Sequence, residues 1–215
     1  MIKVKICGVR TPEDARKCAD AGADAVGMLL AKSPRRITVE QAREVVKALP
    51  SGVKPVIVMM PATAGEAIEA ARAIHPGAIQ LQGDEPPEMV SEIKTALPGT
   101  CIVKAIHVGE GRELEKALQY EKVADAILLD TMSPNRGGSG TTHDWAISKK
   151  IVASVKKPVI LAGGLKPENV ASAVKEVRPY AVDVASGVEG EGRVKEIHLI
   201  NEFIMNAKEA DNGHQ

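Results

Sequence analysis

Short apolar runs alternate with amphipathic stretches along the whole chain, and this alternation restricts the folds that the chain can adopt. It predicts repeated βα units that share a parallel sheet. The runs are rich in Val, Ile and Leu, as expected of strands buried on both faces. The expected strands are Lys3–Cys7, Ala25–Leu30, Pro55–Met59, Ala78–Leu81, Ile102–Ile106, Ala126–Asp130, Pro158–Ala162 and Ala181–Ala185.

Eight βα units of roughly 27 residues fill the chain without a linker, which predicts an α/β protein with a single (β/α)8 TIM barrel over 1–208. A doubly wound sheet is the alternative, but it seldom needs eight strands in so short a chain. No Gly-x-Gly-x-x-Gly follows the first strand to mark a dinucleotide-binding turn. Residues 209–215 are polar and without periodicity, so we expect them to fray.

Several expected helices begin with recognisable capping residues. Thr11 precedes Pro12, the residue type favoured at a first helical position. Thr38-Val39-Glu40-Gln41 matches a capping box, and Lys166-Pro167-Glu168 opens another helix. These signals place helix starts between the expected strands.

Composition excludes several classes of function. A formal net charge of +0 and an aromatic content of 2% argue against binding to nucleic acid through phosphates or base stacking. No apolar run approaches the roughly 20 residues of a membrane span, and no secretory signal opens the chain, so we expect a soluble cytoplasmic protein. The cysteines Cys7, Cys18 and Cys101 show neither a disulfide framework nor zinc-ligand spacing. The oligomeric state stays open.

A thiol and a carboxylate come at the ends of two expected strands, where barrel enzymes place their active sites. Cys7 ends the first strand and Asp130 the sixth. A thiolate can take a proton from carbon, and a carboxylic acid can give one to a leaving oxygen. The alternatives are that Cys7 is inert packing and Asp130 a turn cap. Cys18, on a helix, and Cys101, at a strand start, are expected to be structural.

Glycine-rich loops follow the seventh and eighth strands, the usual phosphate site of barrels. Gly163-Gly164 and Ser186-Gly187 let backbone N–H groups approach an anion closely, so they predict a phosphorylated ligand. Tight turns are the alternative. A further stretch, Gly137-Gly138-Ser139-Gly140, is long for a turn and is interpreted as a flap over the site.

Two arginines follow the second strand. Adjacent residues of an extended loop point in opposite directions, so one of Arg35 and Arg36 is expected to face the site. A guanidinium there suits a carboxylate or phosphate. The histidines show neither triad nor metal-ligand spacing: His107 and His143 lie near the expected site, and His75, His198 and His214 are interpreted as surface residues.

Taken together, the motifs resemble phosphoribosylanthranilate isomerases, the barrel enzymes of tryptophan biosynthesis. The resemblance runs the length of the chain, and the order and spacing of its motifs are specific. The motifs are Lys5-Ile6-Cys7-Gly8 with Glu13-Asp14-Ala15, Gly22-Ala23-Asp24-Ala25-Val26-Gly27, Ser33-Pro34-Arg35-Arg36-Ile37, Gln80-Leu81-Gln82-Gly83, Leu128-Leu129-Asp130-Thr131, Gly138-Ser139-Gly140 with Asp144-Trp145, Gly163-Gly164-Leu165 with Glu168-Asn169-Val170, and Asp183-Val184 with Ser186-Gly187-Val188-Glu189.

The resemblance implies an Amadori rearrangement of N-(5-phosphoribosyl)anthranilate to 1-(2-carboxyphenylamino)-1-deoxyribulose 5-phosphate, without a cofactor or metal. It implies that Asp130 protonates the furanose ring oxygen and that Cys7 removes the C2 proton. It further implies that Arg35 holds the anthranilate carboxylate, that the loops at Gly163-Gly164 and Ser186-Gly187 hold the phosphate, and that Asp183 orients the substrate.

The sequence departs from the family pattern at three places. Gln82 stands where the family usually has histidine, Met59-Met60-Pro61 replaces the usual Val-Asn, and Thr141 replaces a flap lysine. These departures affect substrate contacts and leave the acid and base in place. Two other functions stay as alternatives: a silent barrel that binds a phosphorylated metabolite, and the related aminoaldose isomerase of histidine synthesis, which usually has aspartates at both catalytic strand ends.

Overall fold

The computed structural model describes residues 1–131 and 142–212. The interpretation of residues 137–140 as a flap, and the predictions for Thr141 and His214, lie outside these residues. No helix within the described part is long and apolar enough to cross a membrane.

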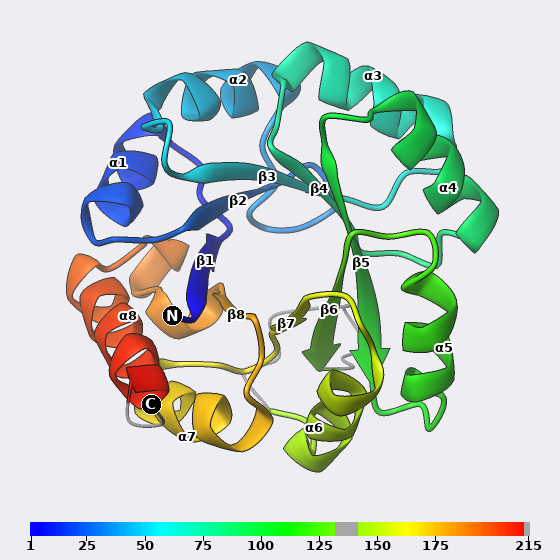
Figure 1. The fold of residues 1–215 in the computed structure, drawn as a ribbon. Helices are drawn as coiled ribbons and strands as arrows, with labels where there is room; N and C mark the ends of the chain where they lie inside the picture. The colour runs from blue at the N-terminus through cyan, green and yellow to red at the C-terminus, as the bar shows by residue number, and fades with distance from the viewer. Residues whose placement is uncertain (132–141, 213–215) are drawn as a thin grey trace.

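Eight parallel strands close into a barrel in sequence order, and the helices form a ring around it (Figure 1). Closure is direct, because the first strand pairs with the last, with Lys5 opposite Asp183. A closed sheet has no edge, so the barrel is confirmed and the doubly wound alternative is wrong. The strands are β1 Lys3–Cys7, β2 Ala25–Leu29, β3 Lys54–Met59, β4 Ala78–Leu81, β5 Cys101–Val108, β6 Ala126–Thr131, β7 Val159–Leu161 and β8 Ala181–Val184.

The helices begin where the capping residues predicted. Thr11 caps the first helix through the N–H of Asp14, and Thr38 and Gln41 form the expected capping box. The helices are α1 Pro12–Asp20, α2 Val39–Ala48, α3 Ala64–Ile74, α4 Pro87–Ala96, α5 Glu113–Tyr120, α6 Trp145–Ser154, α7 Pro167–Val177 and α8 Ile197–Asn212, with short 3-10 helices η1 Ser186–Val188 and η2 Glu191–Arg193.

Apolar side chains form two separate clusters. The larger lies between the sheet and the helices. The smaller takes alternate residues of neighbouring strands, Val103 and Ala105 of β5 and Ala126 and Leu128 of β6. Alternate residues of a strand share one face, and the opposite face of this sheet packs on the helices, so the smaller cluster fills the barrel interior. Polar residues on the same inward face continue this interior toward the carboxyl ends of the strands.

Two segments, β5 and α8, extend furthest beyond the predicted bounds. β5 continues to Val108, which places His107 on the strand opposite Asp130. α8 continues to Asn212, past the point where we expected fraying. Asp211 explains the second difference, because its Oδ2 accepts a hydrogen bond of 2.7 Å from the N–H of Ile2. The last turns of α8 therefore hold the beginning of β1, and the N-terminus lies near the end of α8 (Figure 1).

Candidate active site

Cys7 and Asp130 lie at the carboxyl ends of β1 and β6, as predicted, and both are buried, with 7% and 9% of their surface exposed. Asp183 is on β8, and β8 lies between β6 and β1 in the closed sheet, next to β1. All three occupy positions on the inward-facing side of their strands. The closed sheet therefore brings a thiol and two carboxyl groups to one end of the barrel interior.

The protonation of these groups follows from their burial. Burial raises the pKa of the Cys7 thiol and outweighs the lowering by the nearby cation of Lys5. Burial also raises the pKa of the Asp130 carboxyl; Asp183 adds to this effect, while His107 opposes it. A raised pKa keeps a carboxyl group protonated to higher pH, which suits an acid.

The structure adds contacts of buried polar residues that the sequence analysis did not name as catalytic or substrate-binding. Lys5 Nζ lies 2.7 Å from Asp183 Oδ2 in an ion pair with 6% and 7% side-chain exposure. Gln82 donates a hydrogen bond of 2.9 Å from Nε2 to Asp130 Oδ2. The signal was present in the sequence: Lys5 is two residues before Cys7 on one strand, and a charged residue inside a buried strand needs a partner.

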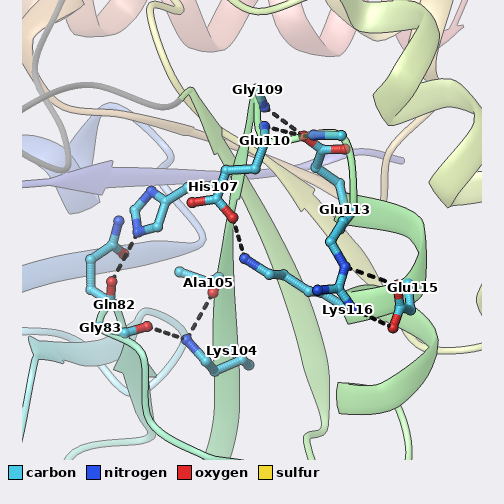
Figure 2. Close-up of polar contacts among 12 residues, drawn as sticks. Gln82, Gly83, Lys104, Ala105, His107, Gly109, Glu110, Glu113, Glu115 and Lys116 are labelled. Atoms are coloured by element: carbon cyan, nitrogen blue, oxygen red, sulfur yellow. Dashed lines mark hydrogen bonds and ion pairs between the residues drawn. The ribbon is translucent and has the colours of Figure 1, made fainter.

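His107 borders Asp130 and is held by the backbone of the neighbouring strand end. Its Nε2 lies 3.0 Å from the carbonyl oxygen of Gln82, as Figure 2 shows. The turn that follows is fixed by Glu113, whose Oε1 accepts hydrogen bonds from the N–H groups of Gly109, Glu110 and Gly111 at 2.6 to 2.8 Å. His107 therefore stands near the end of β5, opposite Asp130 and directly before a turn that Glu113 holds by hydrogen bonds.

Arg35 faces the site and Arg36 does not. Arg35 is only 12% exposed and donates from Nε and Nη2 to the two oxygens of Glu189, at 2.7 and 2.6 Å. Lys195 Nζ lies 2.8 Å from the same carboxylate. These contacts lower the pKa of Glu189 although burial opposes them. The loop is a turn, with Arg36 N–H bonded to the Ser33 carbonyl, and not the extended segment that we expected.

The two glycine-rich loops touch each other. A Cβ at Gly187 would collide with the carbonyl of Leu165, just after Gly163-Gly164. Gly163 and Gly164 have φ of +84° and +68°, a region that favours glycine. Asn169 Nδ2 donates to the Gly164 carbonyl at 3.0 Å and fixes the loop. Among the described residues, neither the Gly163 N–H nor the Gly164 N–H has a backbone hydrogen-bond acceptor.

The other cysteines lie away from this site. Cys18 is on α1, where burial raises its pKa to about 12, and Cys101 begins β5 at the opposite end of the barrel. His75 and His198 are exposed. His143 lies between the hydroxyls of Thr131 and Ser148, at 2.9 and 2.6 Å. Within residues 1–131 and 142–212, no cluster of metal-ligating side chains is present.

A family model and curated relatives match this chain along nearly its whole length. A family model described as N-(5'-phosphoribosyl)anthranilate (PRA) isomerase matches residues 4–206. The N-(5'-phosphoribosyl)anthranilate isomerase of Methanocella arvoryzae is 58% identical over 206 residues, which are 95% of this chain and 97% of that protein.

Solved structures of the same kind superpose closely. Phosphoribosyl anthranilate isomerase from Thermotoga maritima has a TM-score of 0.88 at 40% identity, over 97% of this chain and 100% of its own. A phosphoribosyl anthranilate isomerase in complex with reduced 1-(o-carboxyphenylamino)-1-deoxyribulose 5-phosphate has a TM-score of 0.85 at 38% identity, with the same coverage.

Proposed function

The chain belongs to the N-(5'-phosphoribosyl)anthranilate isomerase family, and from that premise we propose that Cys7 is the base and Asp130 the acid of its reaction. The protein is an isomerase of tryptophan biosynthesis that converts N-(5-phosphoribosyl)anthranilate to 1-(2-carboxyphenylamino)-1-deoxyribulose 5-phosphate. The observation that carries the proposal is the position of the buried thiol and carboxyl at the carboxyl ends of β1 and β6, with Asp183 between them.

The two groups act in sequence. Asp130 gives its proton to the furanose ring oxygen, the bond from that oxygen to C1 breaks, and the nitrogen lone pair forms a protonated Schiff base. Cys7, as thiolate, then takes the proton from C2, and the electrons of that bond neutralise the iminium to give an enolamine. The enolamine gains a proton at C1 and loses the one on the C2 oxygen, which completes the ketose without net gain or loss of atoms.

The remaining residues bind the two charged ends of the substrate. Glu189 occupies the Nε and Nη2 donors of Arg35, which leaves Nη1 free among the described contacts. We assign that free edge to the anthranilate carboxylate, because a guanidinium can bind two carboxylates through different edges. The N–H groups of Gly163-Gly164 and Ser186-Gly187 receive the phosphate, and Asp183 orients the ribose hydroxyls.

Two features separate this function from its alternatives. A silent binder would be expected to have lost the acid or the base, and this chain keeps both. The histidine-pathway isomerase usually has aspartate where this chain has Cys7.

The three cysteines are free thiols, and disulfides are rare in the cytosol, so we also propose a cytoplasmic location.

Steady-state kinetics with the anthranilate substrate, followed by fluorescence, test the proposal. Cys7→Ser and Asp130→Asn should each lower kcat about 10²–10⁴-fold with little change in KM, because each removes one proton transfer. Cys18→Ser and Cys101→Ser are the matched controls and should keep near-normal kcat. Near-normal kcat in either site variant would remove that residue from the mechanism. A wild-type protein that binds a product analogue without turnover would favour the silent binder.

A further inference from the structure

A directed chain of hydrogen bonds crosses the barrel interior from Lys5 to Asp130. Lys5 Nζ donates to Gln80 Oε1 at 2.9 Å, Gln80 Nε2 donates to Gln82 Oε1 at 2.7 Å, and Gln82 Nε2 donates to Asp130 Oδ2 at 2.9 Å. Every member is buried. The hydrogen bonds therefore connect the cation of Lys5 on β1 with the carboxyl group of Asp130 on β6. The two side chains between them are Gln80, on β4, and Gln82, just after it.

The two ends of this chain fix the direction of every bond in it. An ammonium group can only donate, so Gln80 must turn its oxygen toward Lys5 and its nitrogen toward Gln82. Gln82 must then accept a hydrogen bond from Gln80 through its oxygen and donate one to Asp130 through its nitrogen. Oδ2 of Asp130 is thereby held as an acceptor, so the proton that Asp130 transfers resides on Oδ1.

The same lysine lies beside Cys7. The two side chains share the inward face of β1, and a Cβ added at Gly27 on β2 would lie 2.8 Å from Cys7 Sγ and 3.0 Å from Lys5 Cε. Only glycine leaves this space to both side chains. Lys5 is thus packed against the thiol while its ammonium is bonded to Asp183 and Gln80.

We propose that Lys5 is a positioning residue that favours the thiolate of Cys7 and, through Gln80 and Gln82, orients the carboxyl of Asp130. The proposal rests on the roles given above to Cys7 and Asp130. It makes the ionisation of the base and the orientation of the acid depend on one buried cation, which lies beside the thiol and is bonded to Asp183 and Gln80.

Other charges also act on Cys7 and must be separated from Lys5. Asp183 on β8 opposes the thiolate, while Lys195, which precedes α8, favours it. Arg35, in the loop after β2, is a third cation near the thiol. Arg35 and Lys195 are both paired with Glu189, whereas Lys5 is paired with Asp183. A test therefore has to change Lys5 alone and measure the ionisation of the Cys7 thiol directly.

The pH dependence of iodoacetamide alkylation provides that reading in a Cys18→Ala, Cys101→Ala background, where Cys7 is the remaining thiol. Lys5→Met should move the alkylation midpoint to higher pH and slow alkylation at neutral pH about tenfold or more, since an opposite charge at this range favours the ionised form. Lys3→Met is the matched control on the same strand, because Lys3 is exposed and pairs with Asp24; its midpoint should not move. An unmoved midpoint in folded Lys5→Met would overturn the proposal.

Loss of Lys5 leaves Asp183 buried without its cation, so Lys5→Met can fail to fold. In that case Lys5→Met with Asp183→Asn, compared with Asp183→Asn alone, makes the same test without an unpaired charge. The midpoint should again be higher when Lys5 is absent. Equal midpoints in this pair would overturn the proposal.

The link to the acid is tested by Gln82→Met, which keeps the side-chain length and removes the donor to Asp130. The hydrogen bond from Gln82 lowers the pKa of Asp130. Its loss should move the alkaline limb of the kcat profile to higher pH and lower kcat about tenfold or more, with KM nearly unchanged. An unchanged limb, or an effect confined to KM, would contradict this link.

These outcomes separate the proposal from the assignment of the base. If Cys7→Ser keeps near-normal kcat, the proposed mechanism fails, while the alkylation midpoints still measure the effect of Lys5. If Cys7→Ser is inactive and the midpoint ignores Lys5, the mechanism stands and the role of Lys5 fails.

Discussion

At the scale of single residues, neighbouring arginines have different environments. Arg35 is held by both oxygens of Glu189 and lies over Gly8, whereas Arg36 is exposed. Arg35→Ala should raise KM about ten- to a hundredfold, because a charge-assisted bond to a carboxylate contributes about 1.5–3 kcal/mol. Arg35→Lys should recover only part of the loss, since an ammonium lacks the planar fork. Steady-state KM values measure both.

Arg36→Ala is the control for this prediction, as it removes the same group one residue away. Its KM should stay close to the wild-type value. If Arg36→Ala carried the larger KM penalty, the assignment of the two arginines would be reversed, and the roles of Cys7 and Asp130 would be unaffected.

At the scale of elements, the surface that we propose for phosphate is made by two loops that fit against each other. Gly187 in η1 touches the segment that leads into α7, with no room for a side chain. Gly187→Ala should push the loops apart, cost about 1–3 kcal/mol in unfolding free energy and weaken binding of inorganic phosphate. Urea denaturation and a phosphate titration followed by calorimetry measure the two effects.

Gly99→Ala is the matched control, because a Cβ there would meet nothing within 4 Å. It should change the unfolding free energy by less than about 0.5 kcal/mol and leave phosphate binding intact. Equal effects of the two substitutions would show that the close contact of the loops does not determine the site.

At the scale of the whole molecule, the end of α8 holds the residue before β1, the strand that closes the barrel by pairing with β8. Asp211, whose side chain is 36% exposed, binds the N–H of Ile2 and lies 3.6 Å from the N-terminal amine. Asp211→Ala should lower the unfolding free energy by about 0.5–1.5 kcal/mol, since partial exposure weakens the pair. The melting temperature should fall by about 1–6 °C in a chain of this size.

Glu209→Ala removes an exposed carboxylate two residues earlier and should leave the melting temperature unchanged. If the Asp211 and Glu209 variants melted alike, the contact of Asp211 with Ile2 and the N-terminal amine would add nothing to stability.

The sequence alone determined the repeated units, most strand positions and the helix starts. Apolar runs and capping residues act over a few neighbours, so Thr11, Thr38 and the strand Lys3–Cys7 can be recognised locally. The rule that barrel sites lie at strand ends then selected Cys7, Asp130 and the two glycine-rich loops. The polar end of α8 was misjudged, because the partner of Asp211 is at the other end of the chain.

Only the tertiary structure decided which side chains meet. Lys5 bonds to Asp183 and Gln80, which are 178 and 75 residues away, and Arg35 bonds to Glu189, 154 residues away. Local periodicity gives the face on which a residue lies, but not its partner. The partner depends on the register in which β1 closes on β8, and a shift of β1 by one residue would turn the inward side chains of β1 outward. Barrel closure therefore turned separate polar residues into one connected site.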